Sequence, residues 1–196
     1  AWKARCAPFN VNYRYVAEEL RYLLDDSGAR VVIVHECFAA TLSEVVATLA
    51  SAPSLILQVA DGSGHDLVPG AVDYEAALAA VAPAGTPVEL PHDLIDGWSG
   101  DDLYLCYTGG TTGMPKGVVW RHEDVFFALG GGVDAYTNER VTDGNQLAQK
   151  ALATETPMVT LNAPPLMHGA AQWGALRFFF EGNTVVFVPK FSGEAI

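Results

Sequence analysis

The N-terminal part of the chain alternates between helical and extended hydrophobic patterns. Apolar residues recur at helical spacing over residues 15–27, and Gly28 follows at the position where helices commonly end. A continuous run of mostly β-branched residues then occupies residues 30–34, as is typical of a strand buried in a parallel sheet. The pattern repeats as a helix over residues 37–49 and a strand over residues 55–59. This order of elements predicts an α/β fold.

The alternation continues along the rest of the chain with longer interruptions. We expect a short alanine-rich helix over residues 74–81, and residues 83–100, with their prolines and glycines, are predicted to form a linker across the surface. The elements predicted after this linker are a strand over 101–107, an extended run over 117–120, helices over 123–129 and 146–153, a strand over 158–162, a helix over 170–180 and a strand over 184–188. The expected architecture is a largely parallel sheet flanked by helices, without internal repeats.

Composition argues against several classes of protein. The chain has 196 residues, of which 50% are hydrophobic and 17% charged, which indicates a compact body of about one domain. A net charge of −12 and scattered basic residues argue against a nucleic-acid partner. No apolar run is long enough for an integral membrane segment, and no signal peptide is recognisable. The three cysteines and five histidines lack the spacing of disulfide frameworks or metal sites, so a reducing cytoplasm is expected.

One loop, residues 107–118, concentrates the chemistry of the chain. It reads Y-T-G-G-T-T-G-M-P-K-G-V. Its glycines let backbone N–H groups approach an anion, its threonines offer hydroxyl donors and Lys116 adds a positive charge. A helix after the loop would contribute its positive N-terminal end. A turn without a ligand would need neither the lysine nor the hydroxyls, so we predict that the loop binds phosphate at the carboxyl end of the strand over residues 101–107.

The loop is not a Walker A motif, although it contains glycines and a lysine. Pro115 precedes Lys116 and Gly117 follows it, which leaves no hydroxyl next to the lysine for magnesium. In a protein of net charge −12, the local positive potential for an anion is expected to come from Lys116 and Arg121.

The loop resembles the phosphate loop of the adenylate-forming superfamily, which has the usual form Y-T-S-G-T-T-G-x-P-K-G-V. One position departs from this form, because Gly109 stands where the family usually has serine. The Gly-Gly variant followed by Trp120 and Arg121 is similar to a branch of actinobacterial fatty-acyl-CoA synthetases. Residues 10–34 also resemble a structural segment that the family has upstream of the loop.

This resemblance implies an ATP site. The residues expected to hold the β- and γ-phosphates are Thr108, Gly109, Gly110, Thr111, Thr112, Gly113 and Lys116. Mg²⁺ would bridge phosphate oxygens in such a site. The chief metal-holding carboxylate of the family is expected downstream of this chain, so no metal ligand is assigned within it.

A second motif, residues 164–169, resembles the P-x-x-H motif of the same family. The resemblance makes His168 a candidate catalytic residue, beside the substrate carboxylate and the tunnel to the thiol substrate. It also implies that Gly169, Gln172 and Trp173 line the acyl pocket. Taken by itself, His168 could be an ordinary loop histidine, and core packing explains Trp173 about as well as a pocket does.

The resemblance implies an AMP-forming acyl-CoA synthetase, which converts a carboxylic (fatty) acid and ATP to an acyl-adenylate and then transfers the acyl group to coenzyme A. We expect residues 1–196 to be part of one AMP-binding N-terminal domain, without the C-terminal domain, and to be inactive alone. Two alternatives stay open: an adenylation domain that loads an amino or aryl acid onto a carrier protein, and a non-enzymatic nucleotide-binding module. Acyl length and oligomeric state are left open.

Overall fold

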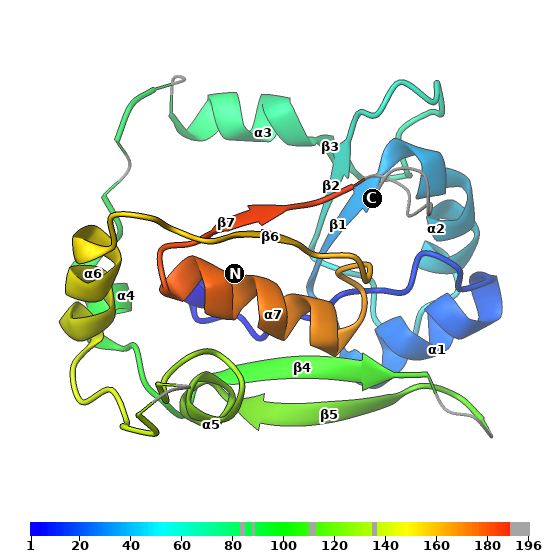
Figure 1. Ribbon diagram of the computed structural model, residues 1–196. Helices are drawn as coiled ribbons and strands as arrows, with labels where there is room; N and C mark the ends of the chain where they lie inside the picture. The colour runs from blue at the N-terminus through cyan, green and yellow to red at the C-terminus, as the bar shows by residue number, and fades with distance from the viewer. Residues whose placement is uncertain (83–84, 88, 110–112, 135–136, 189–196) are drawn as a thin grey trace. The chain divides into compact units, whose positions relative to one another are not determined.

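The computed structural model describes residues 1–82, 85–87, 89–109, 113–134 and 137–188 (Figure 1). The chain divides into two compact units. The parallel-sheet unit consists of Val11–Pro91 and Gly109–Gly117. The hairpin unit consists of Ala1–Asn10, His92–Thr108 and the chain from Val118 onward.

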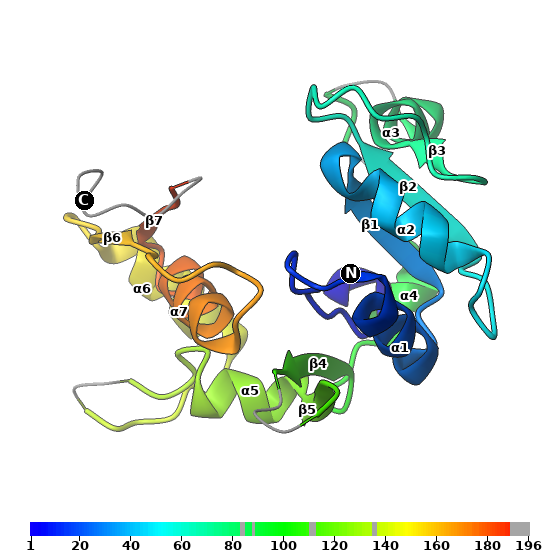
Figure 2. The same cartoon turned by 90° about the vertical axis from the view of Figure 1, so that its right-hand side faces the viewer.

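The parallel-sheet unit is built on three strands in the order β1-β2-β3. The strands are β1 Val31–His35, β2 Leu55–Val59 and β3 Val72–Asp73, and both pairings are parallel. The helices of this unit are α1 Ala17–Ser27, the 3₁₀ turn η2 Glu36–Phe38, α2 Ala39–Val46 and α3 Tyr74–Val81. Parallel strands need a crossover connection, which η2 and α2 provide between β1 and β2 (Figure 2).

The predicted helices and strands of this unit are present, although the predicted helix over 37–49 consists of η2 and α2 and ends at Val46, and β3 was not predicted. Two of the helix ends have clear physical causes. Gly28 follows α1 with a φ of 58°, a left-handed conformation that glycine adopts without steric cost. The Asp73 carboxylate accepts a hydrogen bond from the Ala76 amide at 2.8 Å and so caps the start of α3.

The core of the parallel-sheet unit lies between the helices α1 and α2 and one face of the sheet. Its buried residues are Leu24, Ala39, Leu42, Val45, Ile56 and Val68. One polar side chain joins them: Gln58 is 3% exposed, accepts a hydrogen bond from the Val68 amide at 2.9 Å and donates one to the Asp66 carbonyl at 3.2 Å. The two bonds satisfy an amide that would otherwise be costly to bury.

In the described part of the hairpin unit there are two separate pairs of strands. β4 Leu103–Thr108 pairs with β5 Lys116–Arg121, and the two run in opposite directions (Figure 1). β6 Val159–Leu161 and β7 Thr184–Val186 are parallel, with α7 Gly169–Phe180 as the connection between them. The other helices are η1 Trp2–Ala4, α4 His92–Asp96, α5 His122–Ala128 and α6 Gly144–Ala153.

The fold belongs to the α/β class, but three details differ from the sequence-based expectation. Among the described residues, parallel pairing is confined to the small sheets β1-β2-β3 and β6-β7. The loop after β4 leads into the strand β5, so the next element supplies no helix N-terminus to a bound anion. The predicted surface linker over residues 83–100 contains the helix α4.

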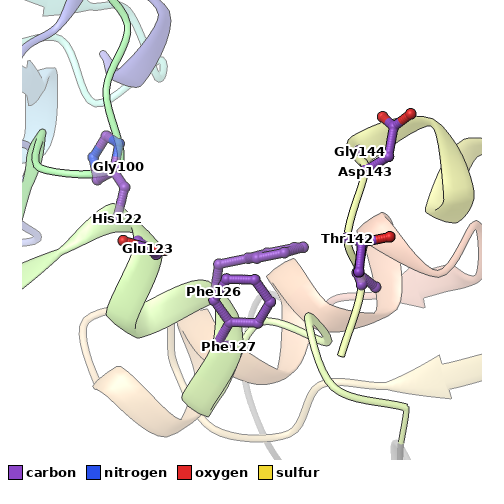
Figure 3. A pocket seen from close by; sticks show the side chains of 9 residues that line it. Gly100, His122, Glu123, Phe126, Phe127, Thr142, Asp143 and Gly144 are labelled. Atoms are coloured by element: carbon purple, nitrogen blue, oxygen red, sulfur yellow. The ribbon is translucent and has the colours of Figure 1, made fainter. Parts of the chain in front are cut away.

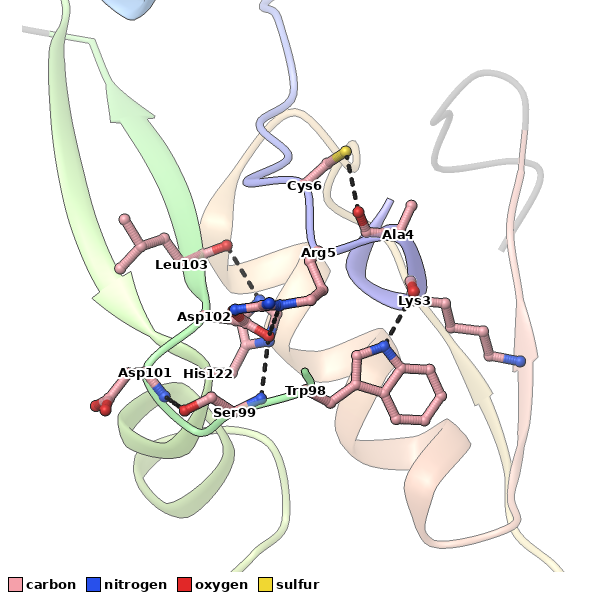
Figure 4. Close-up of polar contacts among 10 residues, drawn as sticks. All are labelled: Lys3, Ala4, Arg5, Cys6, Trp98, Ser99, Asp101, Asp102, Leu103 and His122. Atoms are coloured by element: carbon pink, nitrogen blue, oxygen red, sulfur yellow. Dashed lines mark hydrogen bonds and ion pairs between the residues drawn. The ribbon is translucent and has the colours of Figure 1, made fainter. Parts of the chain in front are cut away.

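Contacts with the N-terminal residues hold the chain that follows α4 (Figure 4). The indole N–H of Trp98 donates a hydrogen bond to the Lys3 carbonyl at 3.0 Å. The Arg5 guanidinium forms an ion pair with Asp102 at 3.1 Å. The hydrogen bond that Arg5 donates to the Asp102 carboxylate, together with the one from the Ser99 amide, lowers the pKa of the Asp102 carboxyl. Composition alone could not reveal these contacts, because the partners are more than ninety positions apart.

Candidate functional site

The predicted phosphate loop occupies the turn between β4 and β5. Thr108 is the last residue of β4 and Lys116 the first of β5, and both are exposed. An ideal Cβ built on Gly109 or on Gly113 would meet no atom within 4 Å, so both glycines border open space. The predicted residues Gly110, Thr111 and Thr112 lie outside the described residues. The expectation that the loop follows the carboxyl end of a strand is confirmed.

Arg121, the other expected source of positive potential, is surrounded by carboxylates. Its Nε lies 3.0 Å from an oxygen of Asp101 and 3.7 Å from one of Asp124, and its Nη2 pairs with Glu123. Three negative charges therefore offset one positive charge at this position. The structure gives no support to a role for Arg121 in attracting phosphate, and Lys116 remains the expected cation of the loop.

The start of α7 packs closely on β4. Tyr104 and Cys106 alternate along β4, are 2% and 7% exposed, and belong to the same buried cluster. A Cβ on Gly169 would lie 2.9 Å from Cζ2 of Trp173 and 3.1 Å from Sγ of Cys106. These distances are shorter than ordinary contacts, so the close approach of α7 to β4 requires glycine at this position.

Trp173, one turn further along α7, is part of an aromatic cluster. Its ring packs edge to face on Trp120 of β5 with the ring centroids 6.1 Å apart. Among the described residues, the buried indole N–H groups of Trp173 and Trp2 have no hydrogen-bond partner. Trp2 packs on Tyr104 and on His122, with centroid distances of 6.0 and 5.3 Å. These contacts favour packing as at least part of the role of Trp173.

Gln172 is held at both ends of its side-chain amide. The Tyr104 hydroxyl donates a hydrogen bond to Oε1 of Gln172 at 2.6 Å. Nε2 of Gln172 donates to the Leu166 carbonyl at 2.7 Å, and Nδ2 of Asn10 donates to the same carbonyl at 2.6 Å. The turn between β6 and α7 is thereby tied to β4 and to the N-terminal segment.

His168 lies at the end of this turn, immediately before α7. Its backbone N–H donates to the Pro165 carbonyl at 3.0 Å, and its own carbonyl accepts from the amides of Ala171 and Gln172. The imidazole does not cap the helix, and the residue is exposed. The backbone is therefore fixed while the ring faces the surface, which leaves the ring accessible to a ligand.

Burial gives Tyr104 an unusual proton affinity. Removal from water raises the pKa of its phenol well above the ordinary value, and the neighbouring Cys106 thiol adds to the rise. The indole of Trp173 acts in the opposite direction, although it lacks the geometry of a hydrogen bond to the phenol. The hydroxyl consequently stays protonated, as its donor role toward Gln172 requires.

The structure brings His168, Gly169, Gln172 and Trp173 together at the start of one helix and places Thr108 and Lys116 at a hairpin turn. Sequence reasoning missed Tyr104 and Asn10. The alternation of Tyr104 and Cys106 along the predicted strand indicated a common face, but nothing in the sequence identified Gln172 as the partner.

Two open hollows of the hairpin unit lie elsewhere. Figure 3 shows the first, of about 440 Å³, where the rings of Phe126 and Phe127 project between α5 and the segment that leads into α6. The second, of about 580 Å³, is lined by residues that include Arg121 and Arg140. None of the described residues predicted to hold phosphate, to act in catalysis or to line the acyl pocket borders either hollow.

His122 contributes to local structure at the end of β5. Its Nε2 lies 3.0 Å from the Leu103 carbonyl, and its amide donates to the Asp102 carbonyl (Figure 4).

The described residues contain no group of three or more His, Cys, Asp and Glu side chains that could hold a metal ion. No helix in the described ranges has the length and hydropathy needed to cross a membrane.

Comparison with known proteins agrees with the loop and the fold. The sequence model of the AMP-binding enzyme family matches residues 1–195, and the chain belongs to this family. It is 47% identical over 188 residues to the medium-chain acyl-CoA ligase Mig of Mycobacterium avium, covering 95% of this chain and 32% of that protein. It is 42% identical over 198 residues to the 3-oxocholest-4-en-26-oate–CoA ligase of Rhodococcus rhodochrous, covering 100% of this chain and 34% of that protein. The chain thus spans about a third of the length of these relatives.

Solved structures share the fold at lower identity. An acyl-CoA synthetase of Brucella canis matches with a TM-score of 0.63 and 18% identity over 97% of this chain and 30% of that one. A red-emitting luciferase of Phrixothrix hirtus matches with a TM-score of 0.66 and 18% identity over 97% of this chain and 42% of that one. At this level of identity the likeness concerns the fold alone.

Proposed function

We propose that the natural polypeptide containing this chain is an AMP-forming acyl-CoA synthetase, an acid–thiol ligase that uses ATP and coenzyme A. The observation that carries the proposal is the 42–47% identity to CoA ligases over 95–100% of the chain. Residues 1–196 would be part of its N-terminal AMP-binding domain. The free cysteines favour a cytoplasmic location.

The reaction brings two anions together. The substrate carboxylate attacks the α-phosphorus of ATP, pyrophosphate leaves, and the thiol of coenzyme A then displaces AMP from the acyl-adenylate. Such a reaction needs fixed donors and positive charge around the phosphates before it starts. Lys116, the Thr108 hydroxyl and the loop amides of Gly109 and Gly113 are the described groups that we assign to this task, together with Gly110, Thr111 and Thr112.

We assign the acid side of the site to the start of α7. The exposed imidazole of His168 would contact the substrate carboxylate, and Gly169, Gln172 and Trp173 would shape the wall of the acyl pocket. Mg²⁺, when bound with ATP, would neutralise phosphate charge. The relatives act on acids that differ widely in shape, medium-chain in one name and sterol-derived in the other. We therefore propose a hydrophobic carboxylic acid as the substrate class.

Acid-dependent exchange between pyrophosphate and ATP tests the first half-reaction. The full-length polypeptide should exchange label with at least one acid from a panel of fatty, sterol-side-chain, aryl and amino acids. It should release AMP when coenzyme A is added. Exchange supported only by amino or aryl acids would contradict the fatty-acid assignment. Exchange with none of the acids would refute the enzyme assignment. The 196-residue chain alone is expected to show no appreciable turnover.

Replacement of Lys116 tests the loop. Lys116→Ala should weaken ATP binding by about ten- to a hundredfold, since a hydrogen bond to a charged group contributes about 1.5–3 kcal/mol. Lys3→Ala removes an exposed lysine from η1 and serves as the matched control. Equal ATP affinity of the Lys116→Ala and Lys3→Ala proteins, measured by calorimetry, would contradict the assignment of the loop.

A further inference from the structure

We propose that Tyr104 and Gln172 are positioning residues that fix the turn carrying His168. The inference rests on the proposed function, because it concerns the place of His168 in that site. Under this proposal Gln172 connects β4 to the turn that carries His168, residues 162–168, and does not serve only to line the acyl pocket.

Only one assignment of donors and acceptors fits the hydrogen bonds that join Tyr104, Gln172 and Leu166. Nε2 of Gln172 donates to the Leu166 carbonyl at 2.7 Å, so Oε1 is the end left to accept, and the Tyr104 hydroxyl at 2.6 Å must be the donor. Leu166 lies two residues before His168. A proton on the phenol thus determines which way the amide faces, and the amide determines where the turn is held.

The Tyr104 end of the connection is rigid. Tyr104 is 2% exposed on a paired strand and packs edge to face on Trp2. The Gln172 end is also fixed, because Gln172 lies in the first turn of α7 and its backbone N–H donates to the His168 carbonyl at 3.2 Å. Two anchored ends are what a side chain needs in order to position a segment between them.

The other restraints on the turn are mostly local: the His168 N–H donates to the Pro165 carbonyl at 3.0 Å and Nδ2 of Asn162 donates to the Ala171 carbonyl at 3.1 Å, and neither bond reaches β4. Residues 162–168 contain two prolines and lie between β6 and α7. Asn10 gives the Leu166 carbonyl a second donor, but from an exposed side chain. Loss of the Tyr104 hydroxyl would leave Oε1 of Gln172 without its partner in a half-buried place, and the amide could then turn away from Leu166.

The test uses the full-length polypeptide with Tyr104→Phe and Gln172→Glu, and Tyr74→Phe on α3 as the matched control. Tyr104→Phe removes the donor. Gln172→Glu keeps an acceptor for Tyr104 but replaces the donor to Leu166 with an oxygen. Two readouts are compared: hydrogen exchange of the amides in peptides covering residues 166–172, and the kinetics of acid-dependent pyrophosphate exchange.

Both variants should show faster hydrogen exchange in this segment than the wild-type and Tyr74→Phe proteins. Their kcat should fall by about ten- to a hundredfold, the effect of a small misplacement of a reacting group, while the KM for ATP stays within about twofold. Unchanged hydrogen exchange in both variants would overturn the positioning role. So would a loss of kcat matched by an equal rise in the KM for ATP, because this pattern indicates general damage.

The outcome is separable from that of the proposed function. A wild-type protein that is inactive with every acid refutes the enzyme assignment. Hydrogen exchange still decides whether Tyr104 and Gln172 hold the turn, because it does not depend on turnover.

Discussion

Two glycines of α7 should respond in opposite directions to the same substitution. Gly169 is the first residue of the helix and touches β4, whereas a Cβ added at Gly174 would meet no atom within 4 Å. Neither residue has a positive φ, so alanine fits the backbone at both positions. The difference between Gly169→Ala and Gly174→Ala therefore measures how closely Gly169 packs against Cys106 of β4 and Trp173 of α7.

The expected magnitudes follow from the contacts. Alanine gains about 0.5–1 kcal/mol over glycine in a helix, and Gly174→Ala should stabilise by this amount. At Gly169 the new methyl would lie 2.9 and 3.0 Å from two ring atoms of Trp173 and 3.1 Å from Sγ of Cys106. Carbon atoms prefer about 3.5–4.0 Å, and overpacking of this kind costs about 1–3 kcal/mol. The ring cannot move freely because it packs on Trp120. We expect a net loss of about 1–2 kcal/mol for Gly169→Ala.

Tryptophan fluorescence is a suitable assay, because all four tryptophans lie in the hairpin unit. Urea unfolding followed by this signal gives the stability of that unit, and the midpoint should rise for Gly174→Ala and fall for Gly169→Ala with an unchanged slope. A Gly169→Ala protein at least as stable as Gly174→Ala would refute the close packing of Gly169 against Cys106 of β4 and Trp173 of its own helix.

Three further predictions concern buried or paired polar groups. Gln58→Leu should destabilise the parallel-sheet unit by about 1–3 kcal/mol, because it leaves the buried Val68 amide without an acceptor. Thermal unfolding followed by circular dichroism measures this loss, and an unchanged unfolding midpoint would contradict the role of Gln58. Because folding raises the pKa of Tyr104, the protonated phenol contributes stability that is full below about pH 10 and is lost as the pH rises toward the folded-state pKa. Tyr104→Phe should therefore lose less stability at alkaline pH than the wild-type protein, as measured by urea unfolding. Equal losses in both proteins would contradict the raised pKa of Tyr104. The pKa of Asp102 is shifted in the opposite direction, so the ionised carboxylate contributes stability that is present above about pH 4 and is lost as the pH falls below it. Asp102→Asn should make the stability measured by tryptophan fluorescence less sensitive to pH between about 6 and 3. An identical pH profile for the two proteins would contradict the pairing of Asp102 with Arg5.

The regular elements were predictable where local chemistry determines them. The helix over residues 74–81 begins and ends where its alanine-rich pattern does, with Asp73 as its cap. The strand over residues 55–59 also has the predicted bounds. Short polar elements were not predictable. α4 has five residues, and the chain after it is held by Trp98 and Asp102 through contacts with the N-terminal residues that no local pattern records.

The candidate site, like the fold, was predictable from the sequence only in part. The order of glycines, threonines and lysine predicted that residues 107–118 bind phosphate, since each residue type has a direct task toward an anion, and the position of this loop after β4 is confirmed. The neutralisation of Arg121 could be foreseen in part, because Glu123 and Asp124 are its near neighbours in the sequence. Asp101 reaches Arg121 from across the turn that precedes β4 and required the structure.

The contacts of Gln172 limit what resemblance to a family can assign. The resemblance gave this residue a place at the acyl pocket, and its position on α7 beside Trp173 is compatible with that place. Its amide, however, has each end engaged within the protein, by Tyr104 and by Leu166. A substrate group that donated to Oε1 of Gln172 would have to displace the hydroxyl of the buried Tyr104, and leaving that hydroxyl unsatisfied costs about 1–3 kcal/mol. Gln172 is therefore better suited to hold the shape of the turn that carries His168 than to recognise polar groups of the acid, and discrimination among hydrophobic acids would fall to the apolar surface around it.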